Sequence, residues 1–368
     1  MSWTKRLFFL AIGIVVPLIL GVFFLELIFG SWLREDQWSK VRAINIIRDV
    51  QINYDVENIY GKTLPTVTYT RDKNGLRGSC KDNKDINVLT LGGSTTDQRY
   101  ISDGKTYQDF LQVQLSEKFR KQVCISNAGV DGHTTFGHLE SFKIWFPLIV
   151  ELKPNYFLFY VGINDAGFRS EPNHGFDQVK RDDESIILSA LRQKSAIYDL
   201  LRNLRNVWLG IRGNSAYAGH SIKLPSETDY TSTIKTNSVE VQIAKNTEAF
   251  EKRFLELMAQ VRSYGAKPIC ISQPHLFTKV VDGNNKGVDN VFEYAGVTYN
   301  GLDYDASISA LSRTMMRLCL ENDGYFIDIA SKKFENGDFY DPVHMTQSGA
   351  KRLANYMYEE FVRQKIRF

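Results

Sequence analysis

Short apolar runs alternate with stretches of helical spacing through the C-terminal three quarters of the chain. The runs predict strands at residues 86–91, 123–125, 156–161, 268–271 and 325–329. The stretches between and after them predict helices at residues 106–120, 136–152, 240–264, 305–321 and 346–364. Strands that alternate with helices form a parallel sheet covered by helices on both faces. The pattern therefore predicts an α/β protein whose functional groups lie at the carboxyl ends of the strands.

The N-terminus carries a different pattern, because residues 7–30 are almost continuously apolar and contain one ionisable residue, Glu26. A helix of this length would span about 36 Å, enough for the hydrocarbon core of a bilayer. We expect a single transmembrane anchor at residues 1–30, with Glu26 reaching toward the interface. A cleaved signal peptide is the alternative, although the apolar run is longer than a usual signal core.

Three further segments follow the apolar run. Residues 31–84 are polar and weakly periodic, and we expect a connector with some local structure. Residues 85–368 hold the alternating pattern and form the expected catalytic domain. A polar insertion at about 166–240 interrupts it, with a predicted helix at 186–206 and a Gly/Ser-rich stretch at 210–219, and is expected to act as a lid or wall of the site.

Composition excludes several classes of protein. Of the 368 residues, 43% are apolar and 24% are charged, so the chain can bury a large core and lacks the signature of disorder. A net charge of +3 without a clustered basic face argues against a nucleic-acid partner. The four cysteines have no zinc-site spacing. Four cysteines could form two disulfides. Because Cys124 and Cys270 lie in apolar runs, we favour the interpretation that these two are buried free thiols.

Polar residues cluster where the predicted strands end. Gly92, Gly93, Ser94 and Thr95 follow the first strand, residues 126–132 follow the second, and residues 162–165 follow the third. Asp341 and His344 stand near the C-terminus, separated by two residues. Each fragment alone is a weak signal, and Ser94 alone would read as a helix cap. All four fragments, in this order and each at a strand end or loop, form a strong joint signal.

The four blocks resemble those of the SGNH/GDSL hydrolase superfamily over roughly residues 70–366. The resemblance implies a three-layer α/β/α, flavodoxin-like, doubly wound sheet of five parallel strands. It also implies Ser94 as nucleophile, Asp341 and His344 as its activating pair, and an oxyanion hole built from Ser94, Gly132 and Asn164. Gly93 replaces the acidic residue of the family's common first block, a form shared by membrane-associated relatives.

The residue types fit that chemistry on physical grounds. A serine hydroxyl becomes a good nucleophile only when a base removes its proton, and a histidine suits this role near neutral pH. A carboxylate three residues before the histidine can orient the imidazole. The sequence shows no metal-ligand spacing among its histidines, and we expect neither a metal nor a cofactor.

Five further residues are predicted to border the substrate: Gly93, Thr95, His133, Asp165 and His275. The glycine permits close approach of a substrate, and the others flank the blocks or, for His275, follow the fourth strand. Alternative roles remain for three of them, since His133 could be a buried loop histidine, Asp165 could hold its own loop, and His275 could lie outside the cleft.

We expect an ester hydrolase that acts on O-acylated cell-surface glycans, with its catalytic domain outside the cytoplasm. Three alternatives stay open: an O-acyltransferase for a surface polysaccharide, a phospholipid acyl hydrolase, and a non-catalytic carbohydrate-binding protein. The apolar Trp208, Leu209 and Ile211 in the insertion are compatible with a lipid substrate. Loss of the serine or the histidine would mark the non-catalytic alternative, and both residues are present. The sequence does not determine the oligomeric state.

Overall fold

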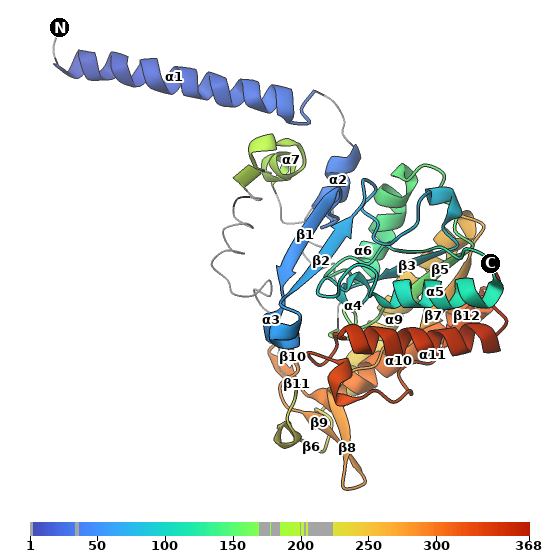
Figure 1. The fold of residues 1–368 in the computed structure, drawn as a ribbon. Coiled ribbons are helices and arrows are strands. Elements are labelled where there is room, and N and C mark those ends of the chain that lie inside the picture. Colours follow the sequence, from blue (N-terminus) through green and yellow to red (C-terminus); the bar gives the residue numbers. More distant parts are fainter. Residues whose placement is uncertain are drawn as a thin grey trace.

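A five-stranded parallel sheet forms the centre of the protein, with strand order β12-β7-β5-β3-β4 (Figure 1). Its strands are β3 (Val88–Gly92), β4 (Ile125–Asn127), β5 (Tyr156–Tyr160), β7 (Lys267–Ile271) and β12 (Tyr325–Ile327). This order is that of a flavodoxin-like doubly wound sheet, in which the chain changes direction beside the first strand. The predicted fold class is therefore confirmed for the sheet, and the change of direction lies between β3 and β5.

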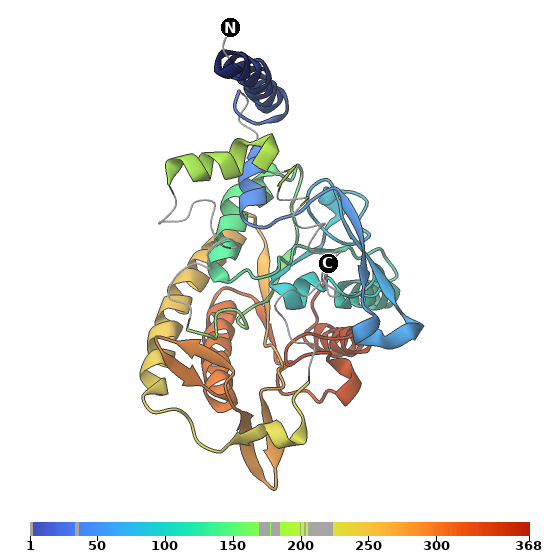
Figure 2. The ribbon, with the colours of Figure 1, turned by 90° about the vertical axis from the view of Figure 1, so that its left-hand side faces the viewer.

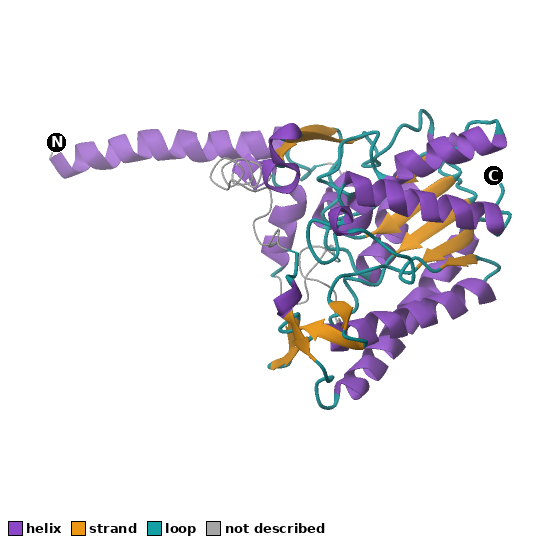
Figure 3. Cartoon of the chain, turned by 60° about the horizontal axis from the view of Figure 1, so that its bottom comes forward, coloured by secondary structure: helices purple, strands orange, loops and turns teal. Residues whose placement is uncertain are grey.

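Helices cover both faces of this sheet (Figure 3). Successive side chains of a strand point to opposite faces, so Phe157 and Phe159 enter one core cluster while Leu158 and Tyr160 enter the other. The helices α9 (Val239–Ser263) and α10 (Gly301–Glu321) contribute to the first cluster. The helices α5 (Tyr107–Phe119) and α11 (Gln347–Arg363) contribute to the second. Burial on both faces explains why β5 is continuously apolar.

The computed structural model describes residues 3–33, 37–168, 177, 185–198, 200–201, 204 and 224–368. Much of the predicted insertion at 166–240 lies outside these residues, including the Gly/Ser-rich stretch at 210–219 and Trp208, Leu209 and Ile211. Its described part contains α7 (Ile186–Lys194) and β6 (Tyr230–Ser232). The helix predicted at 186–206 is interrupted, because Ser195 adopts an extended conformation after α7.

Two helix predictions differ from the structure at their ends. The predicted helix at 136–152 is shorter, since α6 spans Thr135–Glu140 and continues as a π-turn (Ser141–Trp145) and a 3-10 turn (Phe146–Leu148). Pro147, which lacks an N–H, accounts for this end. Helix α10 begins four residues earlier than predicted, because Asn300 and Asp303 form a capping box at its start.

Small antiparallel elements were not predicted. The strands β8 (Thr278–Val281) and β9 (Asn284–Val288) form a sheet with β6, and β10 (Phe292–Tyr294) pairs with β11 (Val297–Tyr299). The strands β8 to β11 belong to the segment between β7 and α10, whereas β6 precedes α9. All of them lie outside the central sheet (Figure 2).

The segment between residues 37 and 84 packs on the catalytic domain (Figures 1 and 2). It contains α2 (Gln37–Ala43), a hairpin of β1 (Val50–Asp55) and β2 (Thr66–Arg71), and the short α3 (Glu57–Tyr60). Ile44, Ile46 and Leu76 are buried in the same cluster as Trp145. The part of the chain expected to be a connector thus contributes side chains to the main core.

Helix α1 (Trp3–Phe29) extends away from the rest of the protein (Figures 1 and 3). Within the part of the chain that the structure describes, no helix has the length and apolar character that crossing a bilayer requires. The transmembrane helix expected at residues 7–30 is therefore not supported by the structure. The Glu26 carboxylate, expected to reach a membrane interface, accepts hydrogen bonds from Trp32 Nε1 at 2.7 Å and from the backbone N–H of Ile197 at 3.0 Å.

All four cysteines are paired in disulfides, Cys80 with Cys124 and Cys270 with Cys319. The Cα–Cα distances of 5.7 and 6.3 Å are ordinary for such bonds. The interpretation of Cys124 and Cys270 as buried free thiols is therefore wrong. Periodicity could not reveal the pairing, because a buried half-cystine and a buried thiol occupy the same apolar positions.

We expect the denatured, unreduced protein to contain no thiol that iodoacetamide can alkylate, as measured by intact mass. Each bridge closes a long loop, with 44 and 49 residues of separation, so its loss should lower the free energy of unfolding by about 4 kcal/mol. Alkylation of any cysteine without reductant would contradict this pairing.

Candidate active site

Ser94 lies where β3 ends and the short helix α4 (Ser94–Asp97) begins. Because it is the first residue of α4, its backbone N–H has no partner within the helix. Its side chain is half-buried, which leaves the hydroxyl accessible at the carboxyl edge of the sheet. The neighbouring β5 and β4 end at the same edge, so the loops that follow all three strands meet beside this serine.

His344 connects Ser94 to Asp341. Its Nε2 lies 2.6 Å from Ser94 Oγ, and its Nδ1 lies 2.6 Å from Asp341 Oδ2. The backbone N–H of His344 also donates to Asp341 Oδ1 at 2.7 Å, which fixes the turn between the two residues. The imidazole stacks on the ring of Tyr340, with planes within 5°. The structure thus places the three residues that the resemblance implies in one hydrogen-bonded line.

The Asp341 carboxylate is held in its charged form. Burial by itself would raise its pKa, but the hydrogen bonds and charge of His344 together with the backbone N–H of Val343 keep the pKa below the ordinary value. A charged carboxylate next to Nδ1 keeps the proton on that nitrogen. It therefore leaves Nε2 unprotonated and facing the Ser94 hydroxyl.

The loops that carry Gly132 and Asn164 meet beside Ser94. Asn164 Nδ2 donates to the carbonyl of His133 at 2.8 Å, which ties the loop after β5 to the loop after β4. An amide nitrogen has two N–H groups, so Asn164 retains a second donor. Gly132 adopts a left-handed conformation with φ 79°, which favours glycine. Asn164 and the carbonyl of His133, next to Gly132, therefore lie beside the serine turn, and an oxyanion hole built from Ser94, Gly132 and Asn164 stays a prediction.

The structure leaves little space for a side chain at position 93, where the family's common first block has an acidic residue. A Cβ atom at this position would lie 2.4 Å from Asn164 Nδ2, closer than real Cβ contacts. A side chain at position 93 would push the amide away from Ser94. The glycine thus allows a close approach of the serine turn to the donor loop, and its contact with substrate stays a prediction.

The other predicted substrate contacts lie mostly in the interior. Thr95 Oγ1 accepts a hydrogen bond from Gln273 Nε2 at 2.9 Å and is buried. His133 is 1% exposed, and its Nε2 lies 2.8 Å from the carbonyl of Ile44. Asp165 is equally buried and binds Thr135 and Arg253. These three residues therefore support the loops of the site from behind.

His275 lies at the border of a cavity, although its side chain is only 7% exposed. Its Nε2 lies 3.1 Å from Asp305 Oδ1, and its Nδ1 accepts the N–H of Phe277 at 3.2 Å. Among Thr95, His133, Asp165 and His275, it is His275 that lines this cavity.

A buried charged cluster behind the site was not predicted. Arg71, on β2, forms an ion pair with Asp97 at the end of α4, and Tyr69 Oη donates to the same carboxylate at 2.8 Å. The Arg71 guanidinium also donates to the carbonyls of Asn127 and Gly129 in the loop after β4. One side chain of the N-terminal hairpin thus binds both the serine helix and the loop that leads to Gly132.

Positive charges surround the buried Asp97 carboxylate. Burial would raise the pKa of Asp97, but the positive charges of Arg71 and Arg99 keep the pKa below its ordinary value. One signal in the sequence could have revealed this cluster. Val67, Tyr69 and Arg71 alternate with more exposed residues in β2, so an arginine lies on the buried face of a strand.

Arg77, which precedes the first strand of the central sheet, is 2% exposed. Its guanidinium donates to the carbonyls of Asp97 and Gln98 at 2.8 Å each and to Asp103 at 2.9 Å. It therefore fixes the chain that follows α4 and does not contact substrate. Among the residues that the structure describes, no group of three or more His, Cys, Asp or Glu side chains could hold a metal ion.

The chain is similar to proteins of known family and structure. Residues 90–352 match the model of the GDSL-like Lipase/Acylhydrolase family. Among solved structures, a catalytic mutant of an acetylxylan esterase from Geobacillus stearothermophilus is similar, with 13% identity and a TM-score of 0.41, covering 77% of this chain and 94% of that chain. An alpha/beta hydrolase enzyme from the metagenome of Lake Arreo shows 14% identity and a TM-score of 0.39, covering 74% and 93%. No curated protein sequence matches the chain.

Proposed function

Because the chain belongs to the GDSL-like lipase/acylhydrolase family, we propose that it is an esterase that forms an acyl intermediate on Ser94. The observation that carries this proposal is the distance of 2.6 Å between Ser94 Oγ and His344 Nε2. At this distance the imidazole can accept the hydroxyl proton as the oxygen attacks a carbonyl carbon.

The reaction proceeds in two halves. Ser94 Oγ adds to the ester carbonyl while its proton moves to His344 Nε2, and the carbonyl oxygen becomes an oxyanion. The tetrahedral intermediate then collapses, the bond to the alcohol breaks, and the alcohol leaves with the proton from His344. A water molecule next gives its proton to His344 and attacks the acyl group, which releases the acid and restores Ser94.

Asp341 acts through the imidazole. During both halves His344 is transiently positive, and the neighbouring carboxylate stabilises that charge while keeping the ring oriented. The low pKa of Asp341 means that this negative charge persists across neutral pH.

Asn164 stabilises the developing oxyanion with its second N–H, together with the backbone N–H groups of Ser94 and Gly132. We expect Asn164→Ala to lower kcat for p-nitrophenyl acetate by about 10²- to 10³-fold, the usual effect of removing one such donor. Asn155→Ala is the matched control, because Asn155 is exposed at the opposite end of β5. Equal kcat values for the two variants would remove Asn164 from the oxyanion hole.

We propose an O-acylated carbohydrate as the substrate class. A cavity of about 520 Å³ between α10 and the loops that follow β7 and β12 is lined mainly by hydroxyl, amide and charged side chains. Such groups bind the hydroxyls of a sugar well and offer little to a long hydrocarbon chain. This polarity supports a glycan ester over a phospholipid.

Intact mass spectrometry tests the intermediate. The protein incubated with a fluorophosphonate should gain one phosphonyl group, on Ser94, and Ser94→Ala should gain none. Incubation with acetyl donors should show an added acetyl group, and a sugar acceptor that consumes it faster than water would establish acyl transfer. Labelling of a residue other than Ser94 would overturn the proposed nucleophile.

We also propose that the catalytic domain works outside the cytoplasm. Two disulfides support this location, since such bonds persist mainly in oxidising compartments. Protease added to intact cells should then digest the domain, or, in cells with an outer membrane, should do so once that membrane is permeabilised. Digestion only after full lysis would place the domain in the cytoplasm.

A further inference from the structure

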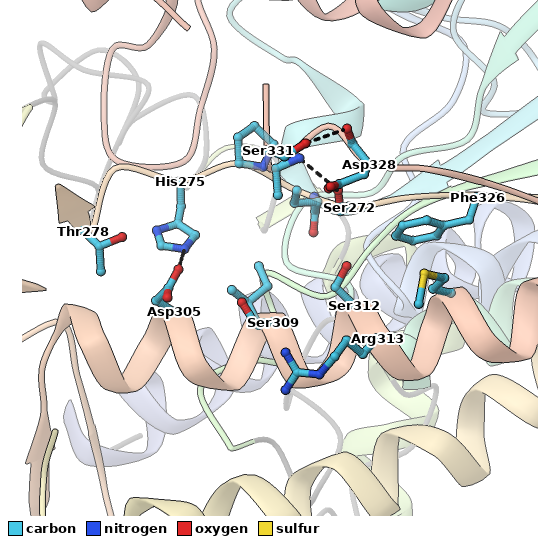
Figure 4. A pocket seen from close by; sticks show the side chains of 15 residues that line it. Ser272, His275, Thr278, Asp305, Ser309, Ser312, Arg313, Phe326, Asp328 and Ser331 are labelled. Atoms are coloured by element: carbon cyan, nitrogen blue, oxygen red, sulfur yellow. Dashed lines mark hydrogen bonds and ion pairs between the residues drawn. The ribbon is translucent and has the colours of Figure 1, made fainter. Parts of the chain in front are cut away.

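A cavity of about 520 Å³ lies between α10 and the loops that follow β7 and β12 (Figure 4). Helix α10 forms one wall with Asp305, Ser309, Ser312 and Arg313. The opposite wall contains Ser272, Asp328 and Ser331, and His275 and Thr278 close one end. The volume is within the range of about 300–1,000 Å³ that is usual for small-molecule sites.

The wall formed by α10 has hydrogen-bonding groups to offer. In the described part of the chain, the Ser309 and Ser312 hydroxyls and the Arg313 guanidinium have no hydrogen-bond or ion-pair partner. Spacings of three and four residues place them on one side of the helix. The opposite side of α10 packs Leu311, Met315 and Leu318 into the core. The polar side of this helix therefore faces the cavity.

The charges around the cavity favour a neutral, hydroxyl-rich ligand. Arg313 is the positive group, while Asp305 and Asp328 are negative. The Asp305 carboxylate lies beside the His275 imidazole, and the Asp328 carboxylate accepts a hydrogen bond from the Ser272 hydroxyl at 2.7 Å. An anion would meet both carboxylates, so one arginine would not hold it well. Sugar hydroxyls, which donate and accept, match this mixture, and Ile308, Met316 and Phe326 provide apolar surface for a ring.

The cavity shares its wall with the active site. Gln273 Oε1 accepts the N–H of Ile163 at 2.8 Å, next to Asn164, and Gln273 Nε2 donates to Thr95, next to Ser94. The N–H of Leu276 donates to the carbonyl of Pro342 at 2.8 Å, in the turn between Asp341 and His344. Strand β7 is two strands from β3, so the cavity lies about 10 Å from the serine turn along the sheet edge.

We propose that this cavity binds sugar units of the substrate that lie away from the scissile ester. The inference rests on the esterase function proposed above, and it adds a glycan subsite next to α10. One part of an oligosaccharide occupies the cavity while a neighbouring unit presents its acyl group to Ser94. Arg313, Ser309 and Ser312 bind sugar hydroxyls, and they take no part in the chemical steps.

Direct binding tests the subsite without requiring turnover. The Ser94→Ala protein is titrated by calorimetry with three neutral hexasaccharides: xylohexaose, cellohexaose and the hexamer of N-acetylglucosamine. At least one should bind, and adding Ser309→Trp, which fills the cavity, should weaken binding at least tenfold. Arg313→Ala should weaken it as well and serves as the milder change if the tryptophan disturbs folding.

Arg317→Ala is the matched control, because Arg317 lies one turn further along α10 and pairs with Glu251 at 2.7 Å outside the cavity. It should leave the affinity within twofold. Absence of binding to all three probes, or equal affinities for Arg313→Ala and Arg317→Ala, would overturn the subsite. Failure of the esterase function would appear differently, as ester hydrolysis that survives Ser94→Ala.

Discussion

Replacing Ser94 with alanine is expected to lower kcat for p-nitrophenyl acetate by a factor on the order of 10⁶, the loss seen when a serine hydrolase loses its nucleophile. The hydroxyl is the atom that forms the acyl bond, and its oxygen lies 2.6 Å from His344 Nε2. The remaining rate would come from the N–H donors and from substrate binding, which the alanine leaves in place. Initial rates at saturating substrate measure the effect.

The control for this variant is Ser263→Ala, which removes an exposed hydroxyl at the end of α9. It should retain full activity, and both variants should unfold at the temperature of the unchanged protein. A Ser94→Ala protein that keeps a tenth or more of the original kcat would refute the assignment of the nucleophile.

Replacing Arg71 with alanine is expected to lower the free energy of unfolding by about 3–5 kcal/mol, because it leaves the Asp97 carboxylate buried without its main partner. The variant also removes donors from the carbonyls of Gly75, Asn127 and Gly129. Because Asp97 ends the serine helix, kcat should fall in the fraction that stays folded. Urea unfolding followed by fluorescence measures the stability.

Arg99→Ala is a graded comparison for this cluster. Arg99 also pairs with Asp97, at 3.5 Å, but its side chain is 27% exposed against 3% for Arg71. A more exposed and longer ion pair contributes less, so its loss should cost about 1 kcal/mol or less. If Arg71→Ala and Arg99→Ala lower the free energy of unfolding by the same amount, the buried ion pair would not be the feature that fixes α4. In that case the hairpin would be held to the domain by its apolar contacts alone.

The Arg71 cluster shows how the N-terminal hairpin serves the site. A hairpin whose polar groups bind the backbone of two active-site loops restricts the motion of both loops. Positioning of this kind matters for catalysis, since small displacements of donors from the oxyanion are costly. The hairpin is therefore part of the working enzyme, and removal of residues 37–84 would disturb the site as well as the core.

Several features of the fold could be predicted from the sequence alone, because each depends on local patterns. Strand β5 is buried on both faces and so reads as an unbroken apolar run. Helices α9 and α11 were predicted to within a residue or two, since the helical period is strong there. The blocks around Ser94, Asn164 and Asp341 were identifiable because glycines and polar residues stand at strand ends and loops, where chemistry is placed in such folds.

Other features depend on contacts between distant parts of the chain, and only the tertiary structure decided them. Periodicity indicates the face of the strand on which Cys124 lies, but it does not identify the cysteine that pairs with it. The fold brings the Cα atom of Cys80 to 5.7 Å from that of Cys124. The burial of Arg71 depends on the presence of Asp97 and two loop carbonyls. The interior places of His133 and Asp165 likewise follow from packing against Ile44 and Arg253. The sequence thus indicated the residues that form the line from Ser94 through His344 to Asp341, because the blocks that carry them are local, whereas the positions of their supports depend on long-range packing.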